Sequence, residues 1–377
     1  MEKIKSILKE AIQNIDPVLF VCATLLSLIS IVTIWGAVDN FGMSKLKMQM
    51  AIFVVGVFVT FFIAFIDYRM IVDKLWLYML IGSVLLLVAT IVFGESGQNM
   101  ETANKSWLKI PGTGFMIQPS EFVKFTFICT FAKHLEGVKD KVNKPLTLLG
   151  LMAHAGLIVG LILLSGDLGV SLVYMGVIAV MLFCAGMSLW YFLGAIVAVG
   201  VSLPFLWSVL APYQQDRIIY GFNPELDPFG YGMQPLMSVE AISRGGFFGE
   251  GLFGGSVYED LAASHTDFIF ATVCEKFGFL GGALVIIAIA VIVVRLVFIA
   301  LSATDAAGRL ICCGIAAIFI LQTLENIGMC MALIPVVGIT LPFMSAGGSS
   351  MLALYMIMGL AHSVRSRERR LYFRGSL

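Results

Sequence analysis

An acidic residue stands where a polar segment meets a long apolar run. Asp267 lies in SHTDFIFATV, directly before a mostly apolar stretch. A carboxylate within a bilayer costs about 2.5–3.5 kcal/mol at mid-depth unless it faces a cavity or a partner. Desolvation would also raise its pKa, which suits a general base. A helix cap, in which Thr266 or Asp267 accepts the first free amide protons, explains the pattern equally well.

A second pair of charges lies in the segment PSEFVK. Glu121 and Lys124 are three residues apart, and Pro119 and Ser120 suit the start of a helix. One interpretation is an ordinary ion pair within the helix. The other is a lysine that meets a phosphate-bearing ligand at the membrane face, and both stay open on sequence alone.

Three further polar residues lie in or beside apolar runs. Asp167, in LLSGDLGVSL, has Gly166 and Gly169 around it, which indicates either a short hairpin or a packing or coupling role. Glu325 lies inside an expected span and is a functional candidate for that reason. His265 could bind metal or phosphate, although a lone histidine is more often a hydrogen-bonded structural residue.

The amino-acid composition indicates the class of protein to which these residues belong. Of 377 residues, 59% are hydrophobic and 13% are charged, whereas soluble domains are about half apolar and about a quarter charged. The net charge is zero, so no basic patch indicates nucleic acid. The seven cysteines form no CxxC, which argues against a disulfide framework or a zinc site. The chain is therefore predicted to be an integral membrane protein.

Apolar runs long enough to span a bilayer recur along the chain, since a spanning helix needs about 20 such residues. They predict an all-α membrane protein with about ten transmembrane helices, in one polytopic domain covering 1–377. The runs lie near 17–38, 48–66, 75–93, 119–135, 145–164, 168–187, 189–210, 277–300, 309–333 and 341–363.

The distribution of Lys and Arg predicts the orientation. With ten spans, most of the 24 basic residues fall on the side that holds both termini, which is the cytoplasmic side. The basic tail, 364–377, is expected to touch anionic lipid headgroups or, alternatively, to bind a partner.

Two long segments, 94–118 and 211–267, fall on the opposite side. Loops of this length are usually functional or disordered, and the second is too rich in aromatic residues to favour disorder. Within it, 238–256 predicts a re-entrant or interfacial helix followed by a glycine-rich turn. Further along, Pro335, Pro342 and Gly347–Gly348 predict a broken helix, of the kind that lines a cavity.

Several motifs together resemble those of the SEDS family (shape, elongation, division and sporulation), the RodA/FtsW type of bacterial membrane protein. The resemblance covers nearly the whole chain, and NIGM with the LPF-S-GGSS form favours the RodA-like branch. The motifs are NKSWLKIPGTGFMIQPSEFVK at 104–124, GDLGVSLV at 166–173, YQQDRI at 213–218, SVEAISRGGFFGEGLFGGS at 238–256, HTDFIF at 265–270 and NIGMCMALIPVVGITLPFMSAGGSS at 326–350.

This resemblance implies a peptidoglycan glycosyltransferase that polymerises lipid II at the outer face of the bacterial cytoplasmic membrane, for cell shape, elongation or division. It implies that Asp267 is catalytic, because a base must take the proton of the acceptor hydroxyl. Cations or a divalent metal, Mg²⁺ or Mn²⁺, would stabilise the pyrophosphate leaving group, with Asp267 a candidate metal ligand. No organic cofactor is expected.

The other expected site residues fall into two groups. Those expected to bind substrate are Lys124, Glu121, Ser120, Arg217, Gln214, Arg244, His265, Thr266, Lys105, Trp107 and Ser345. Those expected to have a structural or coupling role are Asp167 and Glu325.

The chain departs from the family pattern around HTDFIF. The usual Pro-Glu before the motif and a basic residue in the glycine-rich turn are replaced by VYEDLAAS, and the usual acidic pair after it is Glu275–Lys276. The family's QPDLG is SGDLG at 165–169, and Ala346 replaces a tyrosine.

The outer loops also lack a serine nucleophile with SxxK spacing, so cross-linking needs another protein. The resemblance implies a class B penicillin-binding protein and other elongation or division proteins as partners. Two other functions fit the sequence: a flippase for lipid-linked precursors, and a non-catalytic scaffold of a cell-wall complex.

Overall fold

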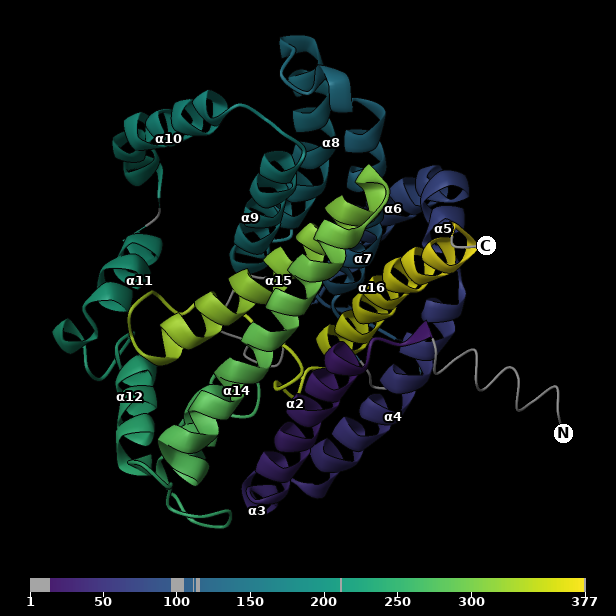
Figure 1. The fold of residues 1–377 in the computed structure, drawn as a ribbon. Coiled ribbons are helices and arrows are strands. Elements are labelled where there is room, and N and C mark those ends of the chain that lie inside the picture. The colour runs from purple at the N-terminus through teal and green to yellow at the C-terminus, as the bar shows by residue number, and fades with distance from the viewer. Residues whose placement is uncertain (1–13, 96–104, 111, 113–115, 211, 376–377) are drawn as a thin grey trace, which may run out of the picture.

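The computed structural model describes residues 14–95, 105–110, 112, 116–210 and 212–375. Helices form a bundle, shown in Figure 1. Six of the described helices are long and apolar enough to cross a membrane: α2 (Pro17–Trp35), α4 (Met43–Phe65), α6 (Trp76–Phe93), α8 (Pro145–Leu164), α14 (Ile269–Ser302) and α15 (Ala306–Cys330).

The other four expected runs are also helical, as α7 (Pro119–Gly137), α9 (Leu168–Cys184), α10 (Leu189–Val209) and α16 (Gly348–Gly375). The ten helices are thus confirmed, while ten membrane crossings stay a prediction. The starts of two helices differ most from expectation: α14 begins at Ile269 rather than near 277, and α16 at Gly348 rather than near 341. The broken-helix prediction explains the second difference, because residues 331–347 are not helical.

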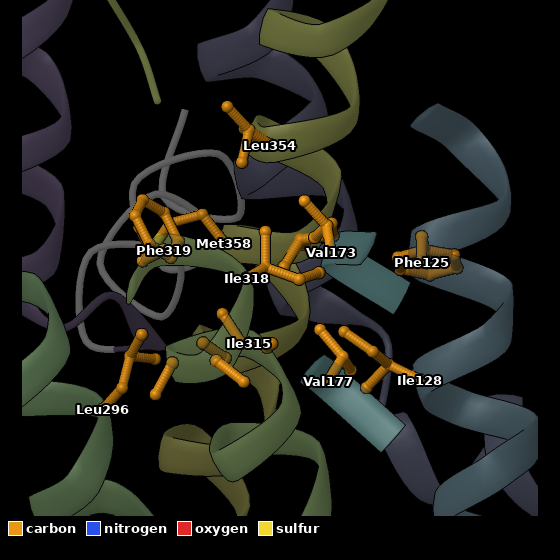
Figure 2. Packing of buried hydrophobic residues seen from close by; sticks show 14 of the residues in the cluster. Phe125, Ile128, Val173, Val177, Leu296, Ile315, Ile318, Phe319, Leu354 and Met358 are labelled. Atoms are coloured by element: carbon orange, nitrogen blue, oxygen red, sulfur yellow. The ribbon is translucent and has the colours of Figure 1, made fainter. Parts of the chain in front are cut away.

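The apolar core lies where α7, α9, α14, α15 and α16 meet (Figure 2). The side chains that fill it include Phe125, Ile128, Val173, Val177, Leu296, Ile315, Ile318, Phe319, Leu354 and Met358. Helix α10, in contrast, stands apart from the bundle in Figure 1, and none of its described side chains is buried. Apolar side chains that remain exposed on a helix of a membrane protein are suited to contact lipid.

Short elements connect these helices. They are α3 (Val38–Phe41), α5 (Tyr68–Lys74), the 3₁₀ turns η1 (Lys139–Lys141) and η2 (Pro224–Leu226), and the antiparallel strands β1 (Leu108–Lys109) and β2 (Met116–Ile117). The long segment 211–267 also contains α11 (Pro212–Phe222), α12 (Met233–Gly245) and α13 (Val257–Asp260). Helix α12 confirms the helix predicted within 238–256, and the glycine-rich turn, residues 246–256, follows it.

Three helix starts converge at one end of the bundle. Gln118, directly before α7, donates a side-chain hydrogen bond to Asp167, which precedes α9 (2.6 Å). The backbone N–H of Gln118 donates to Ser349 in the first turn of α16 (3.1 Å). We call this end, where α2, α6, α8 and α15 also finish, the site end.

The opposite end is held by ion pairs. Arg69 on α5 binds Glu136 at the end of α7 (2.7 Å) and Asp305 before α15 (2.8 Å). Arg295 on α14 binds Asp16 before α2 (2.6 Å). These contacts join helices that are distant in sequence, so the bundle is fastened at both ends.

Candidate active site

Asp267 lies in the turn that precedes α14, at the site end. The N-cap of α14 is Phe268, and no side chain caps this helix. The Thr266 hydroxyl donates to the Ala263 carbonyl instead (3.2 Å). The capping interpretation of Thr266 and Asp267 is therefore wrong, and the acid needs another explanation.

Asn326 fixes the backbone at Asp267. Its side-chain amide donates to the carbonyl oxygens of Asp267 and Ile339, both at 2.7 Å. Asn326 is fully buried on α15, so one amide joins α15, the start of α14 and the loop 331–347. A buried amide that is satisfied in this way holds its neighbours in one arrangement.

The loop 331–347 is fastened to the same segment at two more points. The Ser345 hydroxyl donates to the Thr266 carbonyl (2.7 Å) and accepts the N–H of Leu341 (2.8 Å). The N–H of Ala346 donates to the His265 carbonyl (2.9 Å). The structure thus brings Ser345, His265, Thr266 and Asp267 together.

Gly338 lets this loop pass close to the Asp267 carboxylate. Its φ is +72°, a left-handed conformation that favours glycine, and a Cβ there would lie 3.5 Å from Asp267 Oδ2. No side chain therefore separates the carboxylate from the loop at this point.

The surroundings of Asp267 change its acidity. Burial raises the pKa of Asp267 to about 6; a hydrogen bond from Thr266 opposes the rise and the charge of Asp167 adds to it. Part of its surface remains accessible. A carboxylate of this pKa is ionised at neutral pH and is a stronger base than an exposed aspartate.

Asp167 confirms the hairpin interpretation. It caps α9 by accepting the N–H of Val170 (3.2 Å), and Gly166 before it has a φ of +85°. It also accepts the hydrogen bond from Gln118 and acts electrostatically on Asp267. A coupling role is therefore compatible with its position.

His265 is held by a lysine from α4. Lys45 Nζ lies 2.8 Å from His265 Nε2, and the Phe41 ring lies 5.2 Å from the imidazole. Burial and then the charge of Lys45 lower the pKa of His265 to about 4. The imidazole is thus neutral at neutral pH, and Nε2 accepts from the ammonium. Metal or phosphate binding by His265 stays a prediction.

Glu121 and Lys124 form a buried ion pair in α7. Their charged atoms are 2.6 Å apart, and the side chains are 3% and 2% exposed. The ion-pair interpretation is confirmed, and the lysine lies inside the protein beside Tyr174 and Ile318 rather than on an exposed face. Direct binding of phosphate by Lys124 stays a prediction. Ser120, one residue earlier, is also buried, and its backbone oxygen accepts from Tyr174 (2.7 Å).

The remaining expected residues are less closely grouped. Arg217 on α11 is exposed and donates to the carbonyl of Val336 (3.0 Å), near Gly338; Gln214 lies one turn earlier on the same helix. Lys105 is exposed, and its N–H donates to Ser165 beside the α8–α9 hairpin. Three others lie elsewhere: Arg244 pairs with Glu240 on the exposed face of α12 (2.8 Å), Trp107 pairs through its backbone with Glu95, and Glu325 lies on α15 within electrostatic reach of Lys124.

Four residues at the site were not predicted from sequence: Lys45, Gln118, Asn326 and Gly338. Asn326 had the clearest signal, since it is a polar residue beside Glu325 in an expected span. Lys45 had none, because a lysine at the end of a span is ordinary. Their roles arise from contacts with segments far away in the sequence.

The residues do not form a metal site by themselves. Within the described ranges, no group of three or more His, Cys, Asp or Glu side chains could hold a metal ion. The divalent cation stays a prediction from sequence, and no chemical step is assigned to it.

Comparison with known proteins gives a family and a fold. Residues 14–370 match the model of the FtsW, RodA and SpoVE family, described as cell cycle protein. Stage V sporulation protein E of Bacillus subtilis is 36% identical over 340 residues, which cover 88% of this chain and 89% of that protein. The probable peptidoglycan glycosyltransferase FtsW of Trichlorobacter lovleyi is 32% identical over 358 residues, covering 92% and 91%.

Two solved structures have the same fold. A chain from a peptidoglycan synthase complex, described as coordinating polymerization and crosslinking, matches with a TM-score of 0.80 and 25% identity, covering 94% of this chain and 98% of that one. The rod shape determining protein RodA of Thermus thermophilus matches with a TM-score of 0.69 and 23% identity, covering 94% and 97%.

Proposed function

The chain belongs to the FtsW, RodA and SpoVE family of cell cycle proteins, and we propose that it polymerises lipid II with Asp267 as general base. It is a peptidoglycan glycosyltransferase, and its relatives include several proteins named for that activity. The observation that supports the role of Asp267 most is its placement: a partly accessible carboxylate of raised pKa, which the backbone of the loop 331–347 approaches closely at Gly338.

The reaction requires one proton transfer and one displacement. The acceptor sugar hydroxyl gives its proton to the Asp267 carboxylate while its oxygen bonds to the anomeric carbon of the donor. The bond from that carbon to the pyrophosphate oxygen breaks, and the polyprenyl pyrophosphate leaves with the electron pair. Asp267 then loses its proton to water.

Negative charge develops on the leaving group, so cations should lie near the loop that covers Asp267. Arg217 is exposed and bonded to this loop, and Lys105 is exposed beside the hairpin that carries Asp167. Exposed apolar side chains on the long apolar helices and on α10 offer a surface for the polyprenyl tails. These features support a lipid-linked phosphate substrate.

The chain shares the fold of a protein from a peptidoglycan synthase complex, which supports a partner within such a complex. We infer that this partner is a class B penicillin-binding protein, which would supply the cross-linking activity. The protein is a multi-pass membrane protein, and we infer that Asp267 lies at the outer face of the cytoplasmic membrane.

An in-vitro assay with purified protein and lipid II tests this function, with and without the partner and Mn²⁺. Asp267→Asn should lower the rate of glycan formation about 100-fold or more, as loss of a general base typically does. Asp260→Asn is the matched control, because Asp260 is an exposed acid in the same segment.

Two results would overturn the proposal. Full polymerisation by Asp267→Asn would exclude this residue as the base. Movement of labelled lipid II across vesicles by the wild-type protein, without any polymer, would favour the flippase.

A further inference from the structure

Lys276 is a fully buried cation two turns into α14. Its ammonium donates to three backbone carbonyls: Gly36 (3.2 Å), Leu252 (3.1 Å) and Gly254 (3.1 Å). It also lies 4.0 Å from the centre of the Tyr258 ring. A buried charge is tolerated only when such contacts satisfy it, and an aromatic face adds to them. The Lys276 ammonium therefore has a site built around it.

The neighbouring acid, Glu275, binds the chain where the glycine-rich turn ends. Glu275 is fully buried, and its carboxylate accepts the N–H groups of Ser256, Val257 and Tyr258, each at 2.9 Å. Hydrogen bonds from three N–H groups to a carboxylate are charge-assisted and therefore strong. Lys276 thus binds carbonyl groups of the glycine-rich turn, and Glu275 binds the first amide groups of α13, which directly follows the turn.

The turn wraps closely around α14. At Gly249, where φ is +84°, a Cβ would lie only 2.2 Å from the Lys276 carbonyl oxygen. The N–H groups of Glu250 and Gly251 donate to the carbonyls of Glu275 and Lys276 (2.9 and 3.1 Å). The glycines in this segment thus serve close packing against the helix that begins beside Asp267.

The third carbonyl joins this unit to the end of α2. Gly36 directly follows α2, and the chain continues through Phe41 and Lys45, the two residues that hold His265. The Phe41 ring also contacts the Tyr258 ring (5.9 Å). Lys276 therefore connects the glycine-rich turn with the residues that seat His265, two positions before Asp267.

We propose that Lys276 is a positioning residue for the reaction: its ammonium is a built-in cation that holds the glycine-rich turn and the end of α2 against α14, and so fixes the segment that carries His265 and Asp267. This inference rests on the proposed function.

The test combines hydrogen exchange with steady-state kinetics on the full-length protein. In Lys276→Met, amides within 249–258 should exchange much faster than in the wild type. The kcat for lipid II polymerisation should fall about 10- to 100-fold, as expected for a small misplacement of a catalytic group, while KM changes little. Lys47→Met is the matched control, because Lys47 is an exposed lysine in the first turns of α4, two residues after Lys45.

A rescue experiment separates the charge from the packing. Added propylammonium should restore both the polymerisation activity of Lys276→Ala and the slow hydrogen exchange of its glycine-rich turn. Added propanol, which has no charge, should restore neither. If Lys276→Met does not fold, Tyr258→Leu tests the same connection, since it removes the aromatic face and keeps an apolar side chain; its kcat should fall in the same direction.

Two outcomes would overturn the inference: an unchanged kcat in Lys276→Met despite fast exchange in the turn, or equal rescue by the neutral compound. The proposed function is tested separately, because Asp267→Asn should lower the polymerisation rate about 100-fold or more and leave hydrogen exchange in 249–258 unchanged.

Discussion

Asp267 is suited to act as a base because the protein buries its carboxylate without pairing it with a cation. None of the ion pairs among the described residues includes its carboxylate, and the charge that shifts its pKa is that of another acid, Asp167. Burial without a cation raises the pKa of a carboxylate. An exposed aspartate would be a weaker base, and an aspartate paired with lysine would be weaker still.

The raised pKa of Asp267 predicts the pH dependence of the reaction. The base must be ionised, so kcat should be low in acid and rise through a midpoint near pH 6, the value to which burial raises this pKa. The measurement is lipid II polymerisation at saturating substrate between pH 4.5 and 8. A midpoint near 4, the range of an ordinary aspartate, would contradict the assignment.

Helix α7 contains a pair of opposite charges inside the protein. Glu121 and Lys124 are both buried, and Gln118 at the start of the helix joins it to α9 and α16. Their mutual attraction compensates for their loss of hydration. Either charge alone would be left uncompensated in the core.

A double-mutant comparison tests this pair. Glu121→Ala should destabilise the protein by about 3–5 kcal/mol, because it leaves Lys124 charged and buried. Glu121→Leu combined with Lys124→Met should cost less than Glu121→Ala. The measurement is thermal unfolding in detergent. A double variant less stable than Glu121→Ala would mean that the pair stabilises α7 by more than charge compensation.

At the scale of the whole molecule, the two ends of the bundle differ in their charge contacts. The site end holds Asp267, Asp167 and the glycine-rich turn, whereas the opposite end holds the ion pairs of Arg69 and Arg295. The excess of basic residues in the segments that connect the helices at this opposite end predicts that it faces the cytoplasm.

Tag accessibility tests this orientation. An epitope inserted after Phe229, which is 92% exposed within 211–267, should be reached by antibody in spheroplasts. An epitope after Leu377 should be reached only when the membrane is opened. The reverse pattern would place Asp267 on the cytoplasmic side and would exclude polymerisation at the outer face.

The amino-acid sequence alone determined the ten helices, because each depends on the composition of one continuous apolar run. It also identified Asp267, since a carboxylate directly before such a run is costly wherever the chain folds. Both inferences rest on local properties, namely the length of an apolar segment and the hydration of a charge.

Only the tertiary structure decided what these residues do. It excluded Asp267 as a helix cap and brought Asn326, Lys45 and Gly338 to its segment. It also enclosed Lys276 in carbonyl groups from two separate segments. Such contacts join residues between 24 and 240 positions apart in the sequence, so they depend on how the helices and loops pack against one another, which no local pattern specifies.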